Sequence, residues 1–489
     1  MKHKHPATVI SMVCFLLAPF FVQAQSRAND IENSVFRITN YQQSVDWQSP
    51  WKTTPAEASS GTGFLTGKQL IVTNAHVVSD SRLLIVNKQS TSKPFIADVI
   101  AVAHDSDLAL LKVRDPRFYN DTVPIPLGEM PEIQSHVRTY GYPMGGQKIS
   151  RTEGVISRIE FGTYVHPGID SHLLVQTDSA INPGNSGGPV IQKDQVVGVA
   201  FQSNLRLNDV GYFIPVPLIL RFLKDIEDGV YDGVPEIGVI TSDLLNPSQR
   251  KFLGLDEAMG GVLVERVLPM SSAENLIFPG DVLLKIETSM IDMAGMVHYE
   301  GHRISFFIEA ENRQIGDSLN LTVLRNQSVQ TITLQLKPPP YSQEIRNSYD
   351  VLPEYLIVGG LVFTPLNRNY LQTVGSASAT LVYELLFRGT EQAETRREQV
   401  VVLAQILPAS FNSGYTAMNH FVLNKVNGVI IQSIRHLKEV LRSQKDEQYY
   451  VFESQWTSMP IIMNRKLADD NNEKILRQYG IPQAERIQE

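Results

Sequence analysis

Among its 489 residues the chain has only one cysteine, Cys14, which lies near the N-terminus. If the first residues are removed, the remaining chain can form neither a disulfide nor a thiolate metal site. A chain without thiols suits an oxidising compartment, where a stray thiol is a liability. No run of Lys and Arg stands out either, and the 51 acidic residues outnumber the 43 basic ones. This charge pattern argues against nucleic acid as a partner.

Long hydrophobic runs are also missing, except at the N-terminus. MKHKHP carries two lysines, ATVISMVCFLLAPFFV is apolar, and VQA ends on a small residue. This order predicts a secretory signal peptide over residues 1–24. A transmembrane anchor is the alternative, but the apolar run is short and is interrupted by Pro6, Ser11 and Pro19. We therefore expect export across the inner membrane to the periplasm, with the medium as the alternative, and no stable membrane anchor.

The region from Val35 to about Leu223 consists of short apolar runs separated by turn residues, such as QLIVTNAHVV, DLALLKV and VVGVAFQS. Many short β-rich runs with Gly and Pro between them predict antiparallel β-barrels or sandwiches. The segment 217–229 predicts a helix, because Leu218, Phe222 and Ile226 share one face with Leu223.

A second β-rich unit runs from Pro235 to Leu336, and the rest of the chain partly repeats it. GGVLVERVLPMSS resembles VVVLAQILPASFN, and further on FPGDVLLKIETSMI resembles NHFVLNKVNGVII. The two matching pairs are separated by nearly the same number of residues. This predicts that one domain type occurs twice.

The stretch INPGNSGGP, from Ile181 to Pro189, places one hydroxyl, that of Ser186, among three glycines. Glycines let backbone N–H groups approach a ligand closely. A plain tight turn is the alternative interpretation. A serine hydroxyl needs a base before it can attack a carbonyl, so a histidine and a carboxylate elsewhere decide between the two.

Both groups lie upstream of the serine. His76 follows the buried run LIV, and Asp107 begins the run DLALLKV, with Asp105 as a nearby rival. The order His, Asp, Ser is that of chymotrypsin-type folds. GNSGG also fits the nucleophile elbow of α/β-hydrolases, but Pro189 and the β-branched residues after it are poor helix material, so we reject the elbow.

TNAHVV, DSDLALL and INPGNSGGP, followed by β-rich repeats, resemble the HtrA/Deg family of trypsin-like serine proteases with PDZ domains, closest to its plant-type Deg branch. The resemblance implies a mainly β chain, in which a chymotrypsin-like double β-barrel protease domain precedes two PDZ-like α+β domains. The implied bounds are 25–228 for the protease domain, 235–337 for the first PDZ domain and 349–489 for the second.

The resemblance also assigns roles to the residues. Ser186 is the expected nucleophile, His76 the general base, and Asp107 the group that orients the histidine. The backbone N–H groups of Gly184, Asn185 and Ser186 are expected to form the oxyanion hole. No metal or organic cofactor is expected. Ile181 and Phe201 are expected near the substrate pocket, which would favour cleavage after small or medium apolar residues.

Two expectations concern histidine. The rate should fall as His76 becomes protonated, near or below about pH 6.5 for an unshifted imidazole. The histidines without metal-ligand spacing are expected to be surface or loop residues: His104, His136, His166 and His172.

PDZ domains bind the end of an extended chain as an added strand, with backbone N–H groups holding its carboxylate. The residues of the two loops that match this role are Ile237, Gly238, Val239, Gly359, Gly360 and Leu361. The alternative is that a copy has lost its groove and only packs against a neighbour. For the second copy this alternative is as strong as peptide binding.

HtrA-like proteases are generally trimers or multiples of trimers that loop movements switch, so we expect a homo-oligomer. The segments 160–172 and 202–209 are the candidate sensor and activation loops. Trp47 and Trp51 are candidate interface anchors, or else they cover their own barrel.

Together these features predict an ATP-independent serine endopeptidase that degrades or processes unfolded or damaged proteins in protein quality control and the stress response. Its partners would be unfolded chains and peptide C-termini. The alternative is a chaperone or scaffold that holds unfolded chains while the catalytic residues are mostly unassembled.

Overall fold

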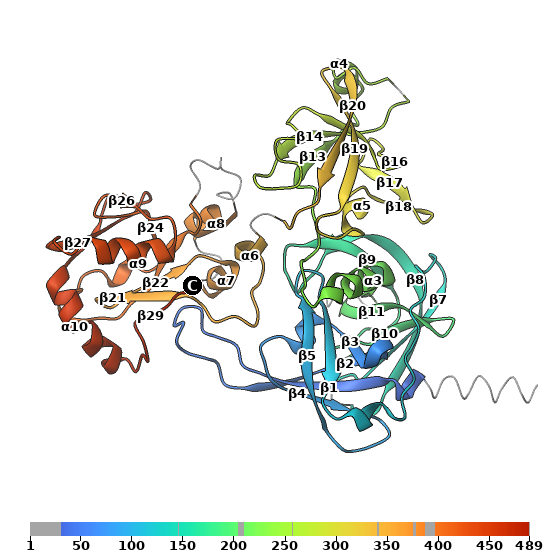
Figure 1. Ribbon diagram of the computed structural model, residues 1–489, viewed down its shortest axis with the longest axis horizontal. Helices are drawn as coiled ribbons and strands as arrows, with labels where there is room; N and C mark the ends of the chain where they lie inside the picture. The colour runs from blue at the N-terminus through green and yellow to red at the C-terminus, as the bar shows by residue number, and fades with distance from the viewer. Residues whose placement is uncertain are drawn as a thin grey trace, which may run out of the picture.

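The computed structural model describes residues 31–144, 146–203, 210–256, 258–339, 342–374, 378–386 and 397–488. The fold is mainly β, as predicted: two β-barrels are followed by a middle unit and a C-terminal unit (Figure 1). The expected signal peptide, residues 1–24, lies outside the described residues. In the described part of the chain, no helix combines the length and the apolar character needed to cross a membrane.

Each barrel is closed by six antiparallel strands, so that no strand edge remains open. The first barrel contains β1 (Val35–Gln42), β2 (Glu57–Thr66), β3 (Leu70–Thr73), β4 (Ser81–Asn87), β5 (Phe95–Ala103) and β6 (Leu108–Val113). The second contains β7 (His136–Gly141), β8 (Ser150–Thr163), β9 (Ser171–Thr177), β10 (Pro189–Gln192), β11 (Gln195–Ser203) and β12 (Gly211–Pro215).

The predicted helix at the end of the barrels is α3 (Val216–Asp225), where Leu218 and Phe222 are buried. A linker then leads to the middle unit. Its main sheet has six strands: five have the order β13-β14-β15-β19-β20, and the sixth, β16, pairs with β15. The elements of the middle unit are β13 (Val239–Asp243), α4 (Pro247–Phe252), β14 (Val262–Val267), β15 (Val282–Ile286), β16 (Ser289–Met290), β17 (Met296–Tyr299), β18 (His302–Ser305), α5 (Ile308–Glu311), β19 (Ser318–Arg325) and β20 (Ser328–Gln335).

The middle unit is joined to the second barrel by a buried ion pair. His172 Nδ1 on β9 lies 3.0 Å from Glu311 Oε2 on α5, and Glu311 also accepts a hydrogen bond from the backbone of Leu173. His172 Nε2 lies 3.0 Å from the carbonyl oxygen of Asp105. Burial lowers the pKa of His172, but the hydrogen bond and charge of Glu311 outweigh burial and raise it. An imidazolium can donate to both acceptors at once.

The C-terminal unit has a five-stranded sheet with the order β24-β23-β22-β21-β29 and a four-stranded sheet with the order β26-β25-β27-β28. Its elements, after the short helix α6 (Ser342–Ile345), are β21 (Tyr355–Val358), β22 (Leu361–Pro365), α7 (Arg368–Val374), α8 (Ala379–Leu386), β23 (Val401–Ile406), β24 (Phe421–Leu423), β25 (Lys425–Val426), β26 (Val429–Ile430), α9 (Ile434–Ser443), β27 (Tyr449–Glu453), β28 (Ile461–Asn464), α10 (Arg465–Gln478) and β29 (Glu485–Arg486).

The loop between β1 and β2 extends from the first barrel to the C-terminal unit (Figure 1). Trp47 and Trp51 pack against the core of that unit, and the Trp51 ring lies 5.9 Å from the ring of Tyr355. The two tryptophans therefore pack on the C-terminal unit of the same chain and not on the interior of their own barrel, and their role as interface anchors stays a prediction. The expectation that they cover their own barrel was wrong, because the loop is long enough to reach a separate core.

We expect Glu311→Ala to free the Leu173 amide and to destabilise the docking of the middle unit by about 3–5 kcal/mol, because the substitution leaves a buried imidazolium unpaired. Faster hydrogen exchange at Leu173 would report this. The stabilisation by His172 should be full below about pH 6.5 and should be lost as the pH rises through its raised pKa.

Glu473→Ala is the matched control. It removes a carboxylate that pairs with Arg477 on the surface of α10, and exposed ion pairs contribute little. Equal rates of amide hydrogen exchange at Leu173 in wild type and Glu311→Ala would contradict the role of Glu311 in docking the middle unit.

Candidate active site

His76 and Asp107 meet at the end of the first barrel. His76 lies on α2 (Ala75–Val78), directly after β3, and Asp107 directly precedes β6. His76 Nδ1 is 2.7 Å from Asp107 Oδ2, and the backbone N–H of His76 donates to the other carboxylate oxygen at 2.9 Å. Asp107 has a φ of 52°, and its carbonyl accepts a hydrogen bond from the side chain of Asn74. The carboxylate is thus held against one side of the imidazole.

The electrostatics of this pair favour a charged carboxylate and a basic imidazole. Burial raises the pKa of Asp107, but the nearby His76 and His166 and the hydrogen bonds from His76 lower it overall. Burial lowers the pKa of His76, but the charge and hydrogen bond of Asp107 raise it overall. The imidazole is therefore a stronger base than a free histidine, and its Nε2 can accept a proton.

Asp105, the rival carboxylate, has a different set of contacts. It accepts hydrogen bonds from the hydroxyl of Tyr231 at 2.5 Å and from the backbone of Val234 at 3.0 Å, both in the linker to the middle unit. Asp107, not Asp105, contacts His76. Asp105 attaches the linker to the segment that carries Asp107.

The loop with Ser186 lies in the second barrel, beside β2 and β3 of the first. The backbone N–H of Thr62 on β2 donates to the carbonyl of Ser186 at 2.8 Å. A Cβ added to Gly187 would lie 2.2 Å from the hydroxyl of Thr73, the last residue of β3. Because His76 comes three residues after Thr73, this contact brings the serine loop to the histidine segment.

The backbone N–H groups of the loop differ in their partners. The Asn185 N–H donates to the carbonyl of Asn182 at 2.9 Å, whereas no backbone acceptor among the described residues engages the N–H groups of Gly184 and Ser186. The Asn185 N–H is thus already used within the loop, which argues against the predicted part of Asn185 in an oxyanion hole. Gly184 and Ser186 retain free donors.

The Ser186 hydroxyl donates to the carbonyl of Phe201 at 3.3 Å, and in the described chain it has no hydrogen bond to His76. Ile181 and Phe201 are both buried. Ile181 packs toward Gly211, and the ring of Phe201 lies 4.6 Å from that of Tyr164. Their role in substrate selection stays a prediction.

Of the histidines expected at the surface or in loops, His166 lies in the loop between β8 and β9 but is buried, and His172 is buried on β9, which contradicts the expectation for it. The ring of His166 lies 6.1 Å from that of His76 and stacks on Tyr349 at 4.1 Å. His104 Nδ1 is 2.9 Å from His166 Nε2. Burial lowers the pKa of His166 to about 4. Sequence spacing could not reveal this cluster, because Tyr349 comes from the segment before the C-terminal unit.

That segment covers the candidate sensor loop between β8 and β9. Arg346 forms two hydrogen bonds of 2.5 Å to Asp170, and the backbone N–H of Asn347 donates to the carbonyl of Pro167 at 3.0 Å. The hydroxyl of Tyr349 donates to the carbonyl of His166. The candidate activation loop, 202–209, lies largely outside the described residues, which include only the backbone of its first two.

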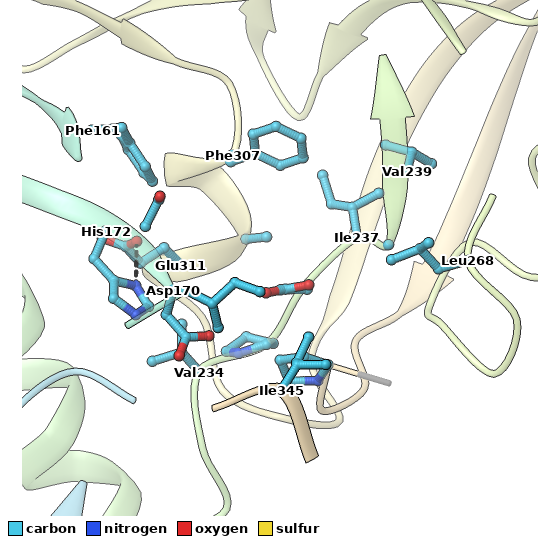
Figure 2. A pocket seen from close by; sticks show the side chains of 17 residues that line it. Phe161, Asp170, His172, Val234, Ile237, Val239, Leu268, Phe307, Glu311 and Ile345 are labelled. Carbon is cyan, nitrogen blue, oxygen red and sulfur yellow. Dashed lines mark hydrogen bonds and ion pairs between the residues drawn. The ribbon is translucent and has the colours of Figure 1, made fainter. Parts of the chain in front are cut away.

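The first candidate peptide loop, Ile237, Gly238 and Val239, lines a cavity of about 360 Å³ between the second barrel, the middle unit and the following linker (Figure 2). Phe161 and Phe307 supply apolar walls, while Glu311 contributes a carboxylate. β13 follows the loop and pairs only with β14 in its sheet, so its other edge is unpaired within the described residues.

The second candidate loop makes the same backbone hydrogen bond as the first, but the edge of the strand that follows it is already paired. The backbone of Leu268 donates to Gly238 in the first copy, and that of Leu407 donates to Gly360 in the second. However, Gly359 and Gly360 form the turn of a hairpin in which β21 pairs with β22. β22 therefore has partners on both edges, β21 and β23, and Leu361 at its start is already paired.

Comparison with known proteins gives the same domain types. The trypsin-like peptidase domain profile matches residues 61–199, and the PDZ domain profile matches residues 345–486. Protease Do-like 2, chloroplastic, from Arabidopsis thaliana is 34% identical over 460 residues, which cover 92% of this chain and 74% of that protein. Protease Do-like 4, mitochondrial, from the same organism is 32% identical over 455 residues, covering 92% of this chain and 84% of that protein.

Solved structures share the fold. The HtrA-type protease AlgW with a tripeptide aligns with a TM-score of 0.50 and 23% identity, covering 65% of this chain and 98% of that one. The two barrels define a trypsin-like peptidase. The chain belongs to the HtrA/Deg family of Do-like proteases and is a serine endopeptidase, which confirms the predicted resemblance. The relatives' names refer to chloroplasts and mitochondria and do not support a periplasmic location.

Because Asp107 raises the pKa of His76, we expect the acid limb of kcat/KM to lie above about pH 6.5, higher than the sequence alone suggested. Asp107→Asn should move the limb to lower pH and reduce kcat by about 10⁴-fold. A pH series with a chromogenic peptide measures both. Asp98→Asn removes an exposed carboxylate of β5 and should leave the profile unchanged. A wild-type limb at or below pH 6.5 would contradict the expectation.

Gly184 has a φ of 99°, and a Cβ there would lie 2.4 Å from the carbonyl oxygen of Tyr142. We expect Gly184→Ala to displace the free N–H and to lower kcat by about 10²–10³-fold, the effect of losing one oxyanion donor. Gly67→Ala is the control, because a Cβ at Gly67 meets no atom within 4 Å. Equal kcat values for the two variants would refute this expectation.

Proposed function

We propose that the chain is an ATP-independent endopeptidase that degrades or processes unfolded or damaged proteins in protein quality control and the stress response, with Ser186 as nucleophile. The observation that carries the proposal is the 2.7 Å contact of His76 with the buried Asp107, next to a serine loop with two free N–H groups. These are the parts that amide hydrolysis by a serine requires.

In the proposed mechanism the Ser186 hydroxyl turns from Phe201 toward His76. His76 Nε2 takes the hydroxyl proton as Oγ bonds to the substrate carbonyl carbon. The N–H groups of Gly184 and Ser186 stabilise the resulting oxyanion. The imidazolium, paired with Asp107, then gives its proton to the leaving amine. Water then attacks the acyl carbon while His76 Nε2 takes its proton. The imidazolium returns a proton to Ser186 Oγ as the bond between the serine and the acyl group breaks.

The middle unit is proposed to take peptide chain ends. The edge of β13 that no described strand pairs with supports addition of a strand, and the loop Ile237, Gly238 and Val239 at its start supports capture of a carboxylate. AlgW, which shares the fold, has been solved with a decapeptide and with a tripeptide. In the C-terminal unit β21 occupies the corresponding edge, which favours a packing role there.

A homotrimer, or a multiple of trimers, and export to the periplasm remain part of the proposal. The family supports the first, and the N-terminal sequence supports the second. A holdase is the second candidate function, and the hydrogen bond from Ser186 to Phe201 rather than to His76 favours it.

Digestion of unfolded casein distinguishes the two functions. Ser186→Ala should reduce cleavage by at least about 10⁴-fold, because it removes the attacking oxygen. Ser328→Ala, an exposed serine at the start of β20, should cleave like wild type. Unchanged cleavage by Ser186→Ala would contradict the mechanism, and no cleavage by wild type together with suppressed casein aggregation would favour the holdase.

A further inference from the structure

Thr62 is a fully buried residue of β2 whose backbone and side chain both contact the serine loop. Its N–H donates to the carbonyl of Ser186 at 2.8 Å, and its hydroxyl donates to the carbonyl of Gly184 at 2.7 Å. The same hydroxyl accepts the backbone N–H of Tyr142 at 2.9 Å. One side chain of the first barrel therefore joins two loop segments of the second.

The two peptide planes on either side of Gly184 are held by different partners, one from each barrel. The carbonyl of Pro183 accepts the backbone N–H of Met144 at 2.8 Å, and the carbonyl of Gly184 accepts the hydroxyl of Thr62. In a trans peptide the C=O and N–H point in opposite directions. The Gly184 N–H therefore points away from Met144 and stays free of backbone acceptors in the described chain.

We propose that Thr62 is a positioning residue for the oxyanion hole. Its hydroxyl holds Tyr142, two residues before the Met144 N–H that fixes the Pro183–Gly184 peptide plane, and it also anchors the Gly184 carbonyl on the other side of the glycine. Both contacts keep the Gly184 N–H directed at the substrate oxygen. This inference rests on the proposed function of Ser186 and Gly184. Thr62 acts through the loop backbone and does not itself touch the substrate.

The chemistry of the hydroxyl explains why this position needs an alcohol. A hydroxyl donates one hydrogen bond and accepts others, so Thr62 can satisfy a carbonyl and an N–H at the same time. Tyr142 and Met144 belong to one short segment, so the hydroxyl also holds the strand end that engages Pro183. Without it, the Gly184 carbonyl and the Tyr142 N–H would lose their partner.

Thr62 also lies where the serine loop meets the strand that leads to His76. The hydroxyl of Thr73 donates to the carbonyl of Thr62 at 2.7 Å, and Thr73 ends the strand that leads to His76. A Cβ at Gly187 would lie 2.0 Å from that same carbonyl oxygen. The serine loop is therefore in direct contact with the strand that presents the base, and Thr62 lies at the contact.

The test compares kcat and KM for a chromogenic peptide in two pairs of variants that differ mainly by one hydroxyl. The pairs are wild type with Thr62→Val, and Thr62→Ser with Thr62→Ala. We expect loss of the hydroxyl to lower kcat by about 10- to 100-fold in each pair, with KM changed less than about 3-fold, because a misdirected donor weakens transition-state binding alone. If Thr62→Val does not fold, the second pair still isolates the hydroxyl.

Two readouts separate positioning from a structural role. The acid limb of the pH profile should be unchanged in Thr62→Val, because His76 and Asp107 are not altered. A peptidyl boronate, which bonds to the serine as a tetrahedral analogue, should bind about 10- to 100-fold more weakly, whereas a product peptide should bind as before.

Thr364→Val is the matched control. Thr364 is also buried in a strand and donates its hydroxyl to a backbone carbonyl, that of Glu354, but it lies in the C-terminal unit. Its kcat should equal that of wild type.

A folded Thr62→Val with wild-type kcat would overturn the inference, and so would a kcat for Thr62→Ser as low as that of Thr62→Ala. Ser186→Ala in the same assay distinguishes failure of the Thr62 inference from failure of the proposed function. If Ser186→Ala is inactive while Thr62→Val is fully active, only the role of Thr62 fails. If Ser186→Ala still cleaves, the proposed function fails as well.

Discussion

The buried contact between His76 and Asp107 depends on a short segment that is held from several sides. Asp107 has a positive φ, which costs free energy for a residue other than glycine and persists only when the surroundings enforce it. The side chain of Asp105, two residues earlier, is bonded to Tyr231 in the linker to the middle unit, and His104 lies against the segment before the C-terminal unit. The geometry of the contact between His76 and Asp107 is thus coupled to the attachment of both following units.

The serine loop imposes a second constraint, because it belongs to the other barrel. Its backbone is held through contacts that cross between barrels, in which Thr62 and Thr73 meet Gly187 at distances that leave no room for a side chain. Among the described residues no backbone acceptor engages the amides of Gly184 and Ser186, while that of Asn185 is used within the loop. Because the site is divided between two closed barrels, the distance between His76 and Ser186 depends on how the barrels are placed relative to each other. In this structure the Ser186 hydroxyl donates to the carbonyl of Phe201.

The two repeated units show how similar sequences can leave the strand after the candidate loop unpaired in one sheet and paired on both edges in the other. In both units the leucine directly after a strand, Leu268 after β14 and Leu407 after β23, donates its backbone N–H to a glycine carbonyl of the candidate loop, that of Gly238 or Gly360. In the middle unit the strand after that glycine ends its sheet, and the loop opens on the cavity in Figure 2. In the C-terminal unit the chain arrives as β21 and fills the edge itself. The approach of the preceding chain decides the difference.

The sequence by itself determined the mainly β fold and the family, and it selected His76, Asp107 and Ser186 as the candidate catalytic residues, because buried strands and glycine-rich loops have local signatures. Only the tertiary structure decided that the Asn185 N–H bonds within its own loop and that His166 lies buried beside His76. It also decided the docking of the β1–β2 loop on the C-terminal unit and the occupied edge of β22. These features arise where segments distant in the chain meet. Their contacts depend on loop paths and packing, which no periodicity or motif encodes.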